Sequence, residues 1–174
     1  MNNSANKKIF LDTAFLASFS IENHPDYKKA RILLTELAVN NYEMYVSPFC
    51  FYELWKVVKE YNDFSRGNWR FIRRFNKILK FIYLKILFIE INFSFKNIFN
   101  DLKICTDKVL QSKFIAVINS NKNHIEIALN AINNFDTKPG DAFHYAAIKD
   151  LNINIVITGN RREFERMGLE VRWF

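Results

Sequence analysis

Three carboxylates in this chain lie where an α/β protein places metal ligands. Asp12 ends an apolar run, Glu53 stands among aromatic residues, and Asp141 follows a Pro-Gly pair. Desolvating an acid beside apolar residues is costly unless the acid is paired or binds a cation. Carboxylate oxygens are the ligands that Mg²⁺ and Mn²⁺ prefer. Three such acids meeting at one edge of a sheet would form an oxygen-ligand site for either ion.

Each acid also has a structural interpretation. Asp12 precedes a predicted helix and Asp141 follows Pro-Gly, so either one would serve as an N-cap. Glu53 is harder to explain in this way, because the first basic residue near it on its helix is Lys56. The helix that begins at Pro48 is expected to place its apolar residues on one face, and these are Phe51, Leu54, Trp55 and Val58.

Strands and helices are predicted to alternate along the chain and to position these acids. The expected strands are 8–12, 45–47, 86–91, 153–158 and 171–173. The expected helices are 13–20, 25–38, one from Pro48, 66–82, two or three within 95–132 with a break near 119–121, 141–150 and 161–166. The alternation predicts an α/β fold of three layers, α/β/α, with a central mostly parallel sheet. Ligands bind such sheets at the carboxyl ends of the strands, where Asp12 and the turn 158–160 are expected.

Four segments, in their order along the chain, resemble the PIN domain family. They are 9–13 (Ile-Phe-Leu-Asp-Thr), 52–54 (Tyr-Glu-Leu), 139–147 (Pro-Gly-Asp-Ala-Phe-His-Tyr-Ala-Ala) and 157–164 (Ile-Thr-Gly-Asn-Arg-Arg-Glu-Phe). The resemblance extends over nearly the whole chain. It implies the fold of a metal-dependent ribonuclease, and many small members resemble the VapC toxins of prokaryotic toxin–antitoxin pairs. This chain is longer than a compact PIN toxin and has extra helical sequence in the 56–135 region.

The resemblance assigns the acids to positions of the family motif. Asp12, Glu53 and Asp141 match the first three acidic positions. The fourth position usually carries Asp in a Thr-x-Asp turn, whereas this chain has Asn160. An amide oxygen still coordinates a cation but brings no negative charge. Glu163, one helical turn further on, would supply the missing carboxylate or would be a solvated helix residue.

These assignments imply a metal-dependent endoribonuclease that uses Mg²⁺ or Mn²⁺. Asp12 and Asp141 would be metal ligands, Glu53 would orient the attacking water or bind the ion, and Asn160 would complete the site. Two alternatives stay open. Asn160 would suit a degenerate PIN fold that binds RNA or a protein without cutting it. Related folds also use acidic clusters for structure-specific DNA cleavage.

Other polar residues stand near the acids in the sequence. His144 lies one turn after Asp141, and a packed or hydrogen-bonded core histidine is favoured over a phosphate contact. Thr13 and Thr158 would either orient the carboxylates by hydrogen bonds or begin helices.

The charge excess is concentrated in one segment. The net charge is +7, and the residues 56–96 contain ten Lys or Arg and three Asp or Glu. An amphipathic helix over 66–82 places six cations on one stripe, namely Arg66, Arg70, Arg73, Arg74, Lys77 and Lys80. Lys and Arg faces are usually only solvated, but a stripe without acids favours binding to the RNA backbone. An acidic segment of an antitoxin-like partner would suit the same stripe.

Length and composition indicate a single domain over 1–174. The chain is 49% hydrophobic and 25% charged, as expected for a globular protein. Its most apolar stretch, 81–89, is interrupted by Lys85 and is shorter than the ~20 residues that span a bilayer. Two isolated cysteines and a polar N-terminus predict a cytoplasmic protein. The family resemblance adds the expectation of a homodimer.

Overall fold

The structure, a computed structural model, describes residues 7–65 and 98–172. The predicted basic helix over 66–82 and the predicted strand over 86–91 lie outside these residues. The descriptions that follow therefore concern the two described ranges.

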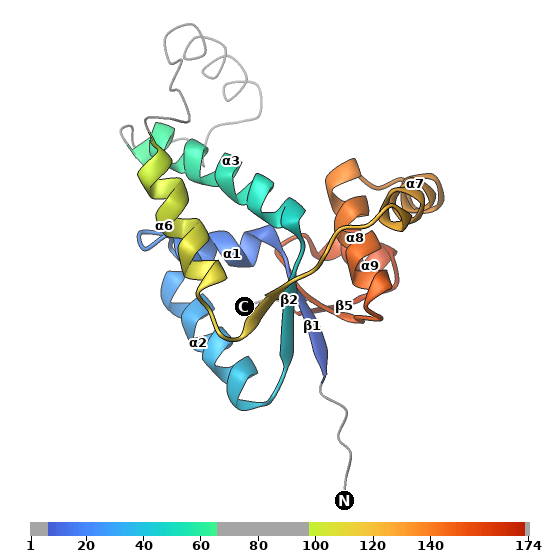
Figure 1. Cartoon of the computed structure of the whole chain (residues 1–174), viewed down its shortest axis with the longest axis horizontal. Coiled ribbons are helices and arrows are strands. Elements are labelled where there is room, and N and C mark those ends of the chain that lie inside the picture. The colour runs from blue at the N-terminus through green and yellow to red at the C-terminus, as the bar shows by residue number, and fades with distance from the viewer. Residues whose placement is uncertain (1–6, 66–97, 173–174) are drawn as a thin grey trace, which may run out of the picture.

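A parallel five-stranded sheet forms the centre of the described residues (Figure 1). Its strands are β1 (Lys8–Leu11), β2 (Glu43–Val46), β3 (Ile115–Val117), β4 (Ile155–Ile157) and β5 (Glu170–Arg172). They lie in the order β3-β2-β1-β4-β5, and every neighbouring pair is parallel. The central strand β1 is paired on both sides, and its residues Ile9, Phe10 and Leu11 are fully buried. Such continuous apolar runs are typical of a parallel strand covered on both faces.

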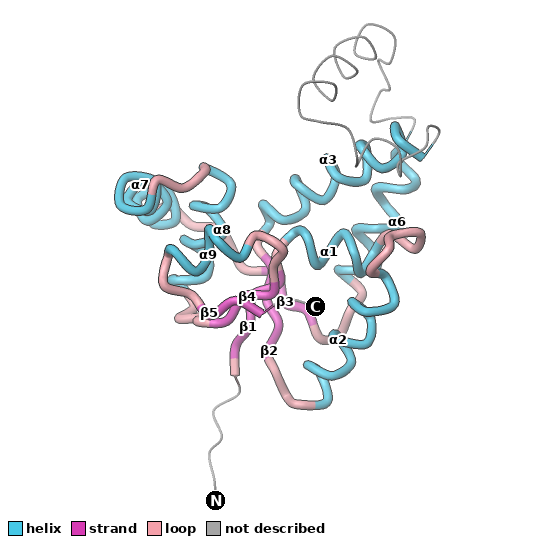
Figure 2. The backbone as a smooth tube through the Cα atoms, turned by 180° about the vertical axis from the view of Figure 1, so that it is seen from behind, coloured by secondary structure: helices cyan, strands magenta, loops and turns pink. Residues whose placement is uncertain are grey.

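Helices cover both faces of this sheet, which confirms the predicted three-layer α/β/α fold (Figures 1 and 2). One layer holds α1 (Thr13–Ser20), α2 (Tyr27–Val39), α3 (Pro48–Ser65) and α6 (Phe99–Leu110). The other layer holds α7 (Asn123–Phe135), α8 (Pro139–Asp150) and α9 (Arg161–Arg166). In the described part of the chain, no helix combines the length and apolar character needed to cross a membrane.

Parallel pairing places the ends of distant strands next to each other. Leu11 of β1 lies beside Ile157 of β4, so Asp12 and Thr158 leave the sheet at the same edge. The backbone N–H of Asp12 donates to the carbonyl of Ile157 at 3.0 Å. The helix α1 starts immediately after Asp12, and α3 starts shortly after β2 at the same edge. This edge therefore gathers the segments that hold the candidate acids.

Two sequence predictions need correction. The region 95–132 was expected to be helical, but it contains the edge strand β3 between α6 and α7. A strand of three residues is too short to show an alternating pattern, and β3 is fixed by its pairing with β2. Trp55 was placed on the apolar face of the helix from Pro48, yet it is 40% exposed and donates through Nε1 to the Thr106 hydroxyl. Its indole nitrogen thus finds a polar partner at the surface.

Candidate metal centre at the carboxyl end of the sheet

Asp12 occupies the N-cap position of α1 without using its side chain as a cap. Its carboxylate is buried, and its Oδ2 accepts a hydrogen bond of 2.6 Å from the Thr158 hydroxyl. The backbone N–H of Asn160 donates to the same hydroxyl oxygen at 2.8 Å. The turn after β4 therefore orients the carboxylate that follows β1, as one of the two interpretations of Thr158 predicted.

Glu53 reaches this edge from the second turn of α3. Its Oε2 accepts a hydrogen bond of 2.6 Å from the Thr13 hydroxyl and lies 2.9 Å from Nε2 of His144. Burial alone would raise the pKa of Glu53, but the hydrogen bonds and charge of His144 and the Thr13 hydroxyl lower it below its ordinary value. Glu53 is thus held as a carboxylate at neutral pH. Thr13 orients an acid, as the interpretation based on hydrogen bonding predicted.

His144 is a fully buried polar residue on α8. Its Nδ1 lies 3.0 Å from the Ser47 hydroxyl, and its Nε2 faces Glu53 at 2.9 Å and Asp12 at 3.8 Å. Burial lowers the pKa of the imidazole, while Cys50, Glu53 and Asp12 raise it, and the balance lies well above the ordinary value. The prediction of a hydrogen-bonded core histidine is confirmed, although its partner is one of the candidate catalytic acids.

Asp141 lies in the first turn of α8 but is not its N-cap, because the helix begins at Pro139 and Lys138 occupies the cap position. Its Oδ2 accepts a hydrogen bond of 3.3 Å from the side-chain amide of Asn160. Burial raises the pKa of Asp141, and the charge of Asp12 raises it further. Burial and the neighbouring acids thus disfavour the ionised form of Asp141 more than the charge of His144 favours it.

Glu163 lies at the periphery of this acidic group. Its Oε2 forms an ion pair with the Arg166 guanidinium and lies 3.4 Å from the Thr137 hydroxyl that donates to it. Its charge contributes to the raised pKa of Asp141, so the two carboxylates interact electrostatically. In this arrangement Glu163 is partnered by Arg166.

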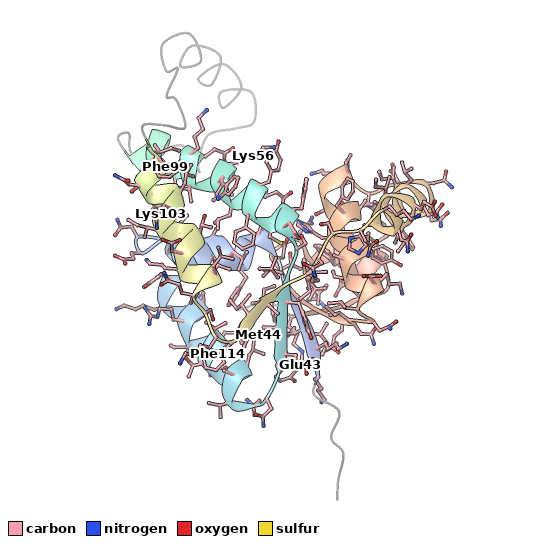
Figure 3. The ribbon with its side chains drawn as sticks, viewed as in Figure 1. Glu43, Met44, Lys56, Phe99, Lys103 and Phe114 are labelled. Atoms are coloured by element: carbon pink, nitrogen blue, oxygen red, sulfur yellow. The ribbon has the colours of Figure 1, made fainter. Side chains whose placement is uncertain are left out.

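The six cations predicted to bind nucleic acid, from Arg66 to Lys80, lie outside the described residues. Among the described cations, Lys56 extends from α3 one turn after Glu53 (Figure 3). Its ammonium lies 4.0 Å from the ring centroid of Tyr52, and its charge helps to lower the pKa of Glu53. This places one positive side chain beside the acidic group.

Sequence reasoning missed the part that Ser47 takes in this site. Ser47 precedes Pro48 at the start of α3 and is buried with its hydroxyl against His144. A serine before a helical proline normally indicates only a helix start. No signal in the sequence linked it to a residue of α8.

The donor set suits a hard divalent cation. Ligand atoms of Asp12, Glu53 and His144 all lie within 4.8 Å of one another. Asp141 lies close enough to Asp12 and Glu53 for their negative charges to raise its pKa. A bound cation would relieve this repulsion. Carboxylate oxygens such as those of Asp12 and Glu53 are ligands typical of Mg²⁺ or Mn²⁺. These residues therefore fit the metal that the family resemblance implies.

Comparison with known proteins agrees with this fold. The chain matches the PIN domain family over residues 9–169. It therefore belongs to the PIN domain family. The comparison with curated proteins found no match.

Solved structures with the same fold include VapC and VapBC proteins. VapC20 of Mycobacterium tuberculosis, described as a toxin cleaving the sarcin–ricin loop, is 16% identical with a TM-score of 0.56, over 92% of this chain and 95% of that one. VapBC-1 from nontypeable Haemophilus influenzae is 14% identical with a TM-score of 0.53, over 95% and 96%. VapBC2 from Rickettsia felis, bound to a DNA fragment from its promoter, is 12% identical with a TM-score of 0.52, over 95% and 98%. At these identities the likeness concerns the fold.

Proposed function

We propose that this protein is a metal-dependent endoribonuclease that hydrolyses phosphodiester bonds of RNA with Mg²⁺ or Mn²⁺. The observation that supports the proposal best is that Asp12, Glu53 and His144, from three distant segments, bring ligand atoms within 4.8 Å of one another in a PIN-domain fold. Asp141 lies close enough to be affected by the charges of Asp12 and Glu53. Ligand and active sites of open parallel sheets lie at the carboxyl ends of the strands.

Asp12, Glu53 and Asp141 would hold the cation, and Asn160 would contribute its amide oxygen. Glu163, whose Oε2 is paired with Arg166, would be a further ligand. When bound, the divalent ion supplies a polarised water and neutralises the charge that develops on the phosphate.

The protein's own side chains have separate tasks in this mechanism. Glu53 has a lowered pKa, so it is ionised at neutral pH and can accept a hydrogen bond from the attacking water. Thr158 keeps the carboxylate of Asp12 in a fixed orientation by its hydrogen bond of 2.6 Å. Lys56 stands beside Glu53 and would contact a backbone phosphate of the RNA. Positioning and charge together would therefore promote the reaction.

A toxin role is supported by the kind of proteins that share the fold. VapC20 is described as a toxin, and the names of the two VapBC structures include VapC. By this analogy the chain would act on RNA in the cytoplasm, form a homodimer and be inhibited by a small antitoxin-like protein. The basic stripe from Arg66 to Lys80 would bind the RNA backbone or an acidic segment of that partner.

A degenerate, non-cleaving PIN domain is the second candidate function. Asn160 replaces the fourth acid, and its amide group donates to Asp141 instead of adding a negative charge. A site with one charge fewer would bind a divalent ion more weakly. Metal affinity therefore separates the two candidates.

The test is cleavage of a mixed-sequence single-stranded RNA by the full-length protein with Mn²⁺. We expect cutting that EDTA abolishes and that Asp12→Asn and Asp141→Asn reduce by at least about 100-fold. The matched control is Glu36→Gln, which removes one exposed charge from α2 and should cut like the wild type. Cleavage that survives both active-site substitutions would refute the proposal.

Calorimetric titration with Mn²⁺ completes the test. Absence of both cutting and Mn²⁺ binding would favour the degenerate binding module. Absence of cutting with Mn²⁺ binding intact would point to a specific RNA target. A flapped DNA substrate cut faster than RNA would instead support a DNA nuclease.

A further inference from the structure

We propose that His144 is a positioning residue that determines which oxygen of Glu53 faces the reacting groups. The inference rests on the proposed nuclease function, because it specifies how Glu53 is presented to the attacking water. It concerns a side chain outside the acidic motif of the family. Four observations support it.

The first observation is that the two hydrogen bonds to Glu53 reach the same oxygen. Oε2 accepts from the Thr13 hydroxyl at 2.6 Å and lies 2.9 Å from Nε2 of His144. The other oxygen, Oε1, lies on the side of Gly140, where a Cβ would come within 2.8 Å of it. With Oε2 occupied by two donors, Oε1 is the oxygen left to act on water.

The second observation is the short distance between Nε2 of His144 and the Glu53 carboxylate, which requires a hydrogen on Nε2. A bare nitrogen lone pair at 2.9 Å from a carboxylate oxygen would be repelled, so Nε2 bears the hydrogen and donates it to Glu53. In the neutral ring, Nδ1 then accepts from the Ser47 hydroxyl at 3.0 Å; in the charged ring, Nδ1 donates to it. The ring is a donor to Glu53 in either state.

The third observation is that the ring has little freedom to move. His144 is fully buried, and the rings of Phe10 and Phe49 each lie with centroids 5.6 Å from its own. Packed aromatic neighbours and a hydrogen bond at each nitrogen fix the plane of the imidazole. A rigid donor can hold a carboxylate in one orientation, which a solvated donor cannot.

The fourth observation is that the arrangement spans the two helices that hold the acids. Ser47 and Glu53 lie before and within α3, while His144 and Asp141 lie on α8. The contacts from Ser47 to His144 and from His144 to Glu53 tie these helices together beside Asp12. His144 thereby fixes Glu53 relative to Asp141 as well as in its own orientation.

The test compares two replacements of His144. His144→Gln keeps an N–H near the position of Nε2, whereas His144→Met has similar bulk and no donor. We expect His144→Met to lower kcat for RNA cleavage by about 100-fold with KM changed less than about twofold, and His144→Gln to remain within about 10-fold of the wild type. Equal losses in both variants would overturn the proposal.

A double-mutant cycle with Glu53→Gln separates positioning from general packing. If His144 acts through Glu53, adding His144→Met to Glu53→Gln should cost less than about threefold more. A loss of about 100-fold in the Glu53→Gln background would show that His144 acts through the packing of the site instead.

Two measurements do not depend on catalysis. In ¹⁵N histidine spectra of the metal-free protein we expect a protonated Nε2 on His144, with a resonance that shifts in Glu53→Gln. In electron spin-echo spectra of the Mn²⁺-loaded protein we expect no ¹⁴N coupling, because Nε2 of His144 donates a hydrogen bond to Glu53 and does not coordinate the ion. An unprotonated Nε2 or a clear ¹⁴N coupling would make His144 a ligand and overturn the proposal. If the wild type does not cut RNA but both spectra are as expected, the proposed function fails while the hydrogen bond to Glu53 stands.

Discussion

Asp141 and Glu53 belong to one acidic group but hold their charges in different ways. Glu53 receives hydrogen bonds from Thr13 and His144, which lower its pKa. Asp141 is partly buried near Asp12 and accepts only a long hydrogen bond of 3.3 Å from Asn160 among the interactions described for it, and its pKa is raised. Ionisation of Asp141 therefore destabilises the folded state when no cation is bound.

This difference predicts the effect of Asp141→Asn on the metal-free protein. A carboxyl whose pKa is raised by folding stabilises the fold below its ordinary value of 3.8, and this contribution is lost as the pH rises through the raised pKa. At pH 7 the variant should therefore have a free energy of unfolding about 0.5 kcal/mol higher than the wild type, a small value because Asp141 is partly exposed. Urea unfolding at pH 7 and pH 4.5 measures this difference, which should shrink at the lower pH.

The control for this prediction is again Glu36→Gln on α2, whose stability should follow the wild type at both pH values. Adding Mn²⁺ at pH 7 should reverse the order, because only the wild type has the full ligand set. An Asp141→Asn protein that is less stable than the wild type without metal would show that the carboxylate is compensated in the fold.

At the scale of elements, the close approach of α8 to α3 positions Glu53. The first turn of α8 passes Glu53 at Gly140, where an added Cβ would lie 2.8 Å from Oε1 of Glu53 and 3.2 Å from Cε1 of Phe49. A glycine at this helical position allows the two helices to approach. The carboxylate must move if the glycine gains a side chain.

Gly140→Ala should therefore separate activity from stability. Ala favours a helix over Gly by up to about 1 kcal/mol, and this gain opposes the strain of the new contacts with Glu53 and Phe49. The melting temperature should therefore change little. The shifted Glu53 carboxylate should lower RNA cleavage by about 10-fold or more. Thermal unfolding and cleavage assays on the same preparation test this pair of effects, and full activity would mean that Glu53 can move without consequence.

The packing of α3 against α1 predicts a contrast between two leucines. Leu54, next to Glu53, is fully buried, whereas Leu129 on α7 is 61% exposed. Leu54→Ala should lower the free energy of unfolding by about 2–5 kcal/mol, because it opens a cavity in the core. Leu129→Ala, the matched control, should lower it by less than about 1 kcal/mol. Chemical unfolding of both variants gives the comparison, and similar losses would contradict the burial of Leu54.

At the scale of the whole molecule, the charge of the chain is distributed unevenly. The segment 56–96 carries the entire excess of +7, and only its beginning belongs to the described residues. A concentrated positive charge of this kind attracts a polyanion and makes its binding sensitive to salt. The RNA affinity of the full chain should therefore fall steeply as the salt concentration rises.

The salt dependence can be assigned to the predicted basic helix. Each phosphate contact with a single strand contributes a slope of roughly −0.7 to the plot of log K against log salt. Replacing Arg73 and Arg74 together by Gln should reduce the slope by about 1.4, measured by fluorescence anisotropy in the Asp12→Asn background to limit cleavage. Replacing Lys28 and Lys29 on α2 removes the same charge and should leave the slope unchanged. Equal changes in both pairs would indicate a response to net charge alone.

The sequence by itself determined the local elements and the order of the acidic positions. The helices at Thr13–Ser20 and Arg161–Arg166 match the predicted ranges, because apolar spacing and helix boundaries are encoded within a few residues. The apolar run before Asp12 likewise fixed β1, since a buried strand needs continuous apolar residues. The alternation of such elements was enough to predict the three-layer fold.

Only the tertiary structure decided how the candidate acids are held. Sequence spacing left Asp12 either a helix cap or a functional acid, and the structure shows its side chain hydrogen-bonded to Thr158 in the turn after β4. The short strand β3 and the contact of Ser47 with His144 were equally invisible in the sequence. Such contacts depend on the relative orientation of elements far apart in the chain, which no local pattern encodes. The chain specifies which residues reach the sheet edge, and packing specifies which oxygen and nitrogen atoms meet there.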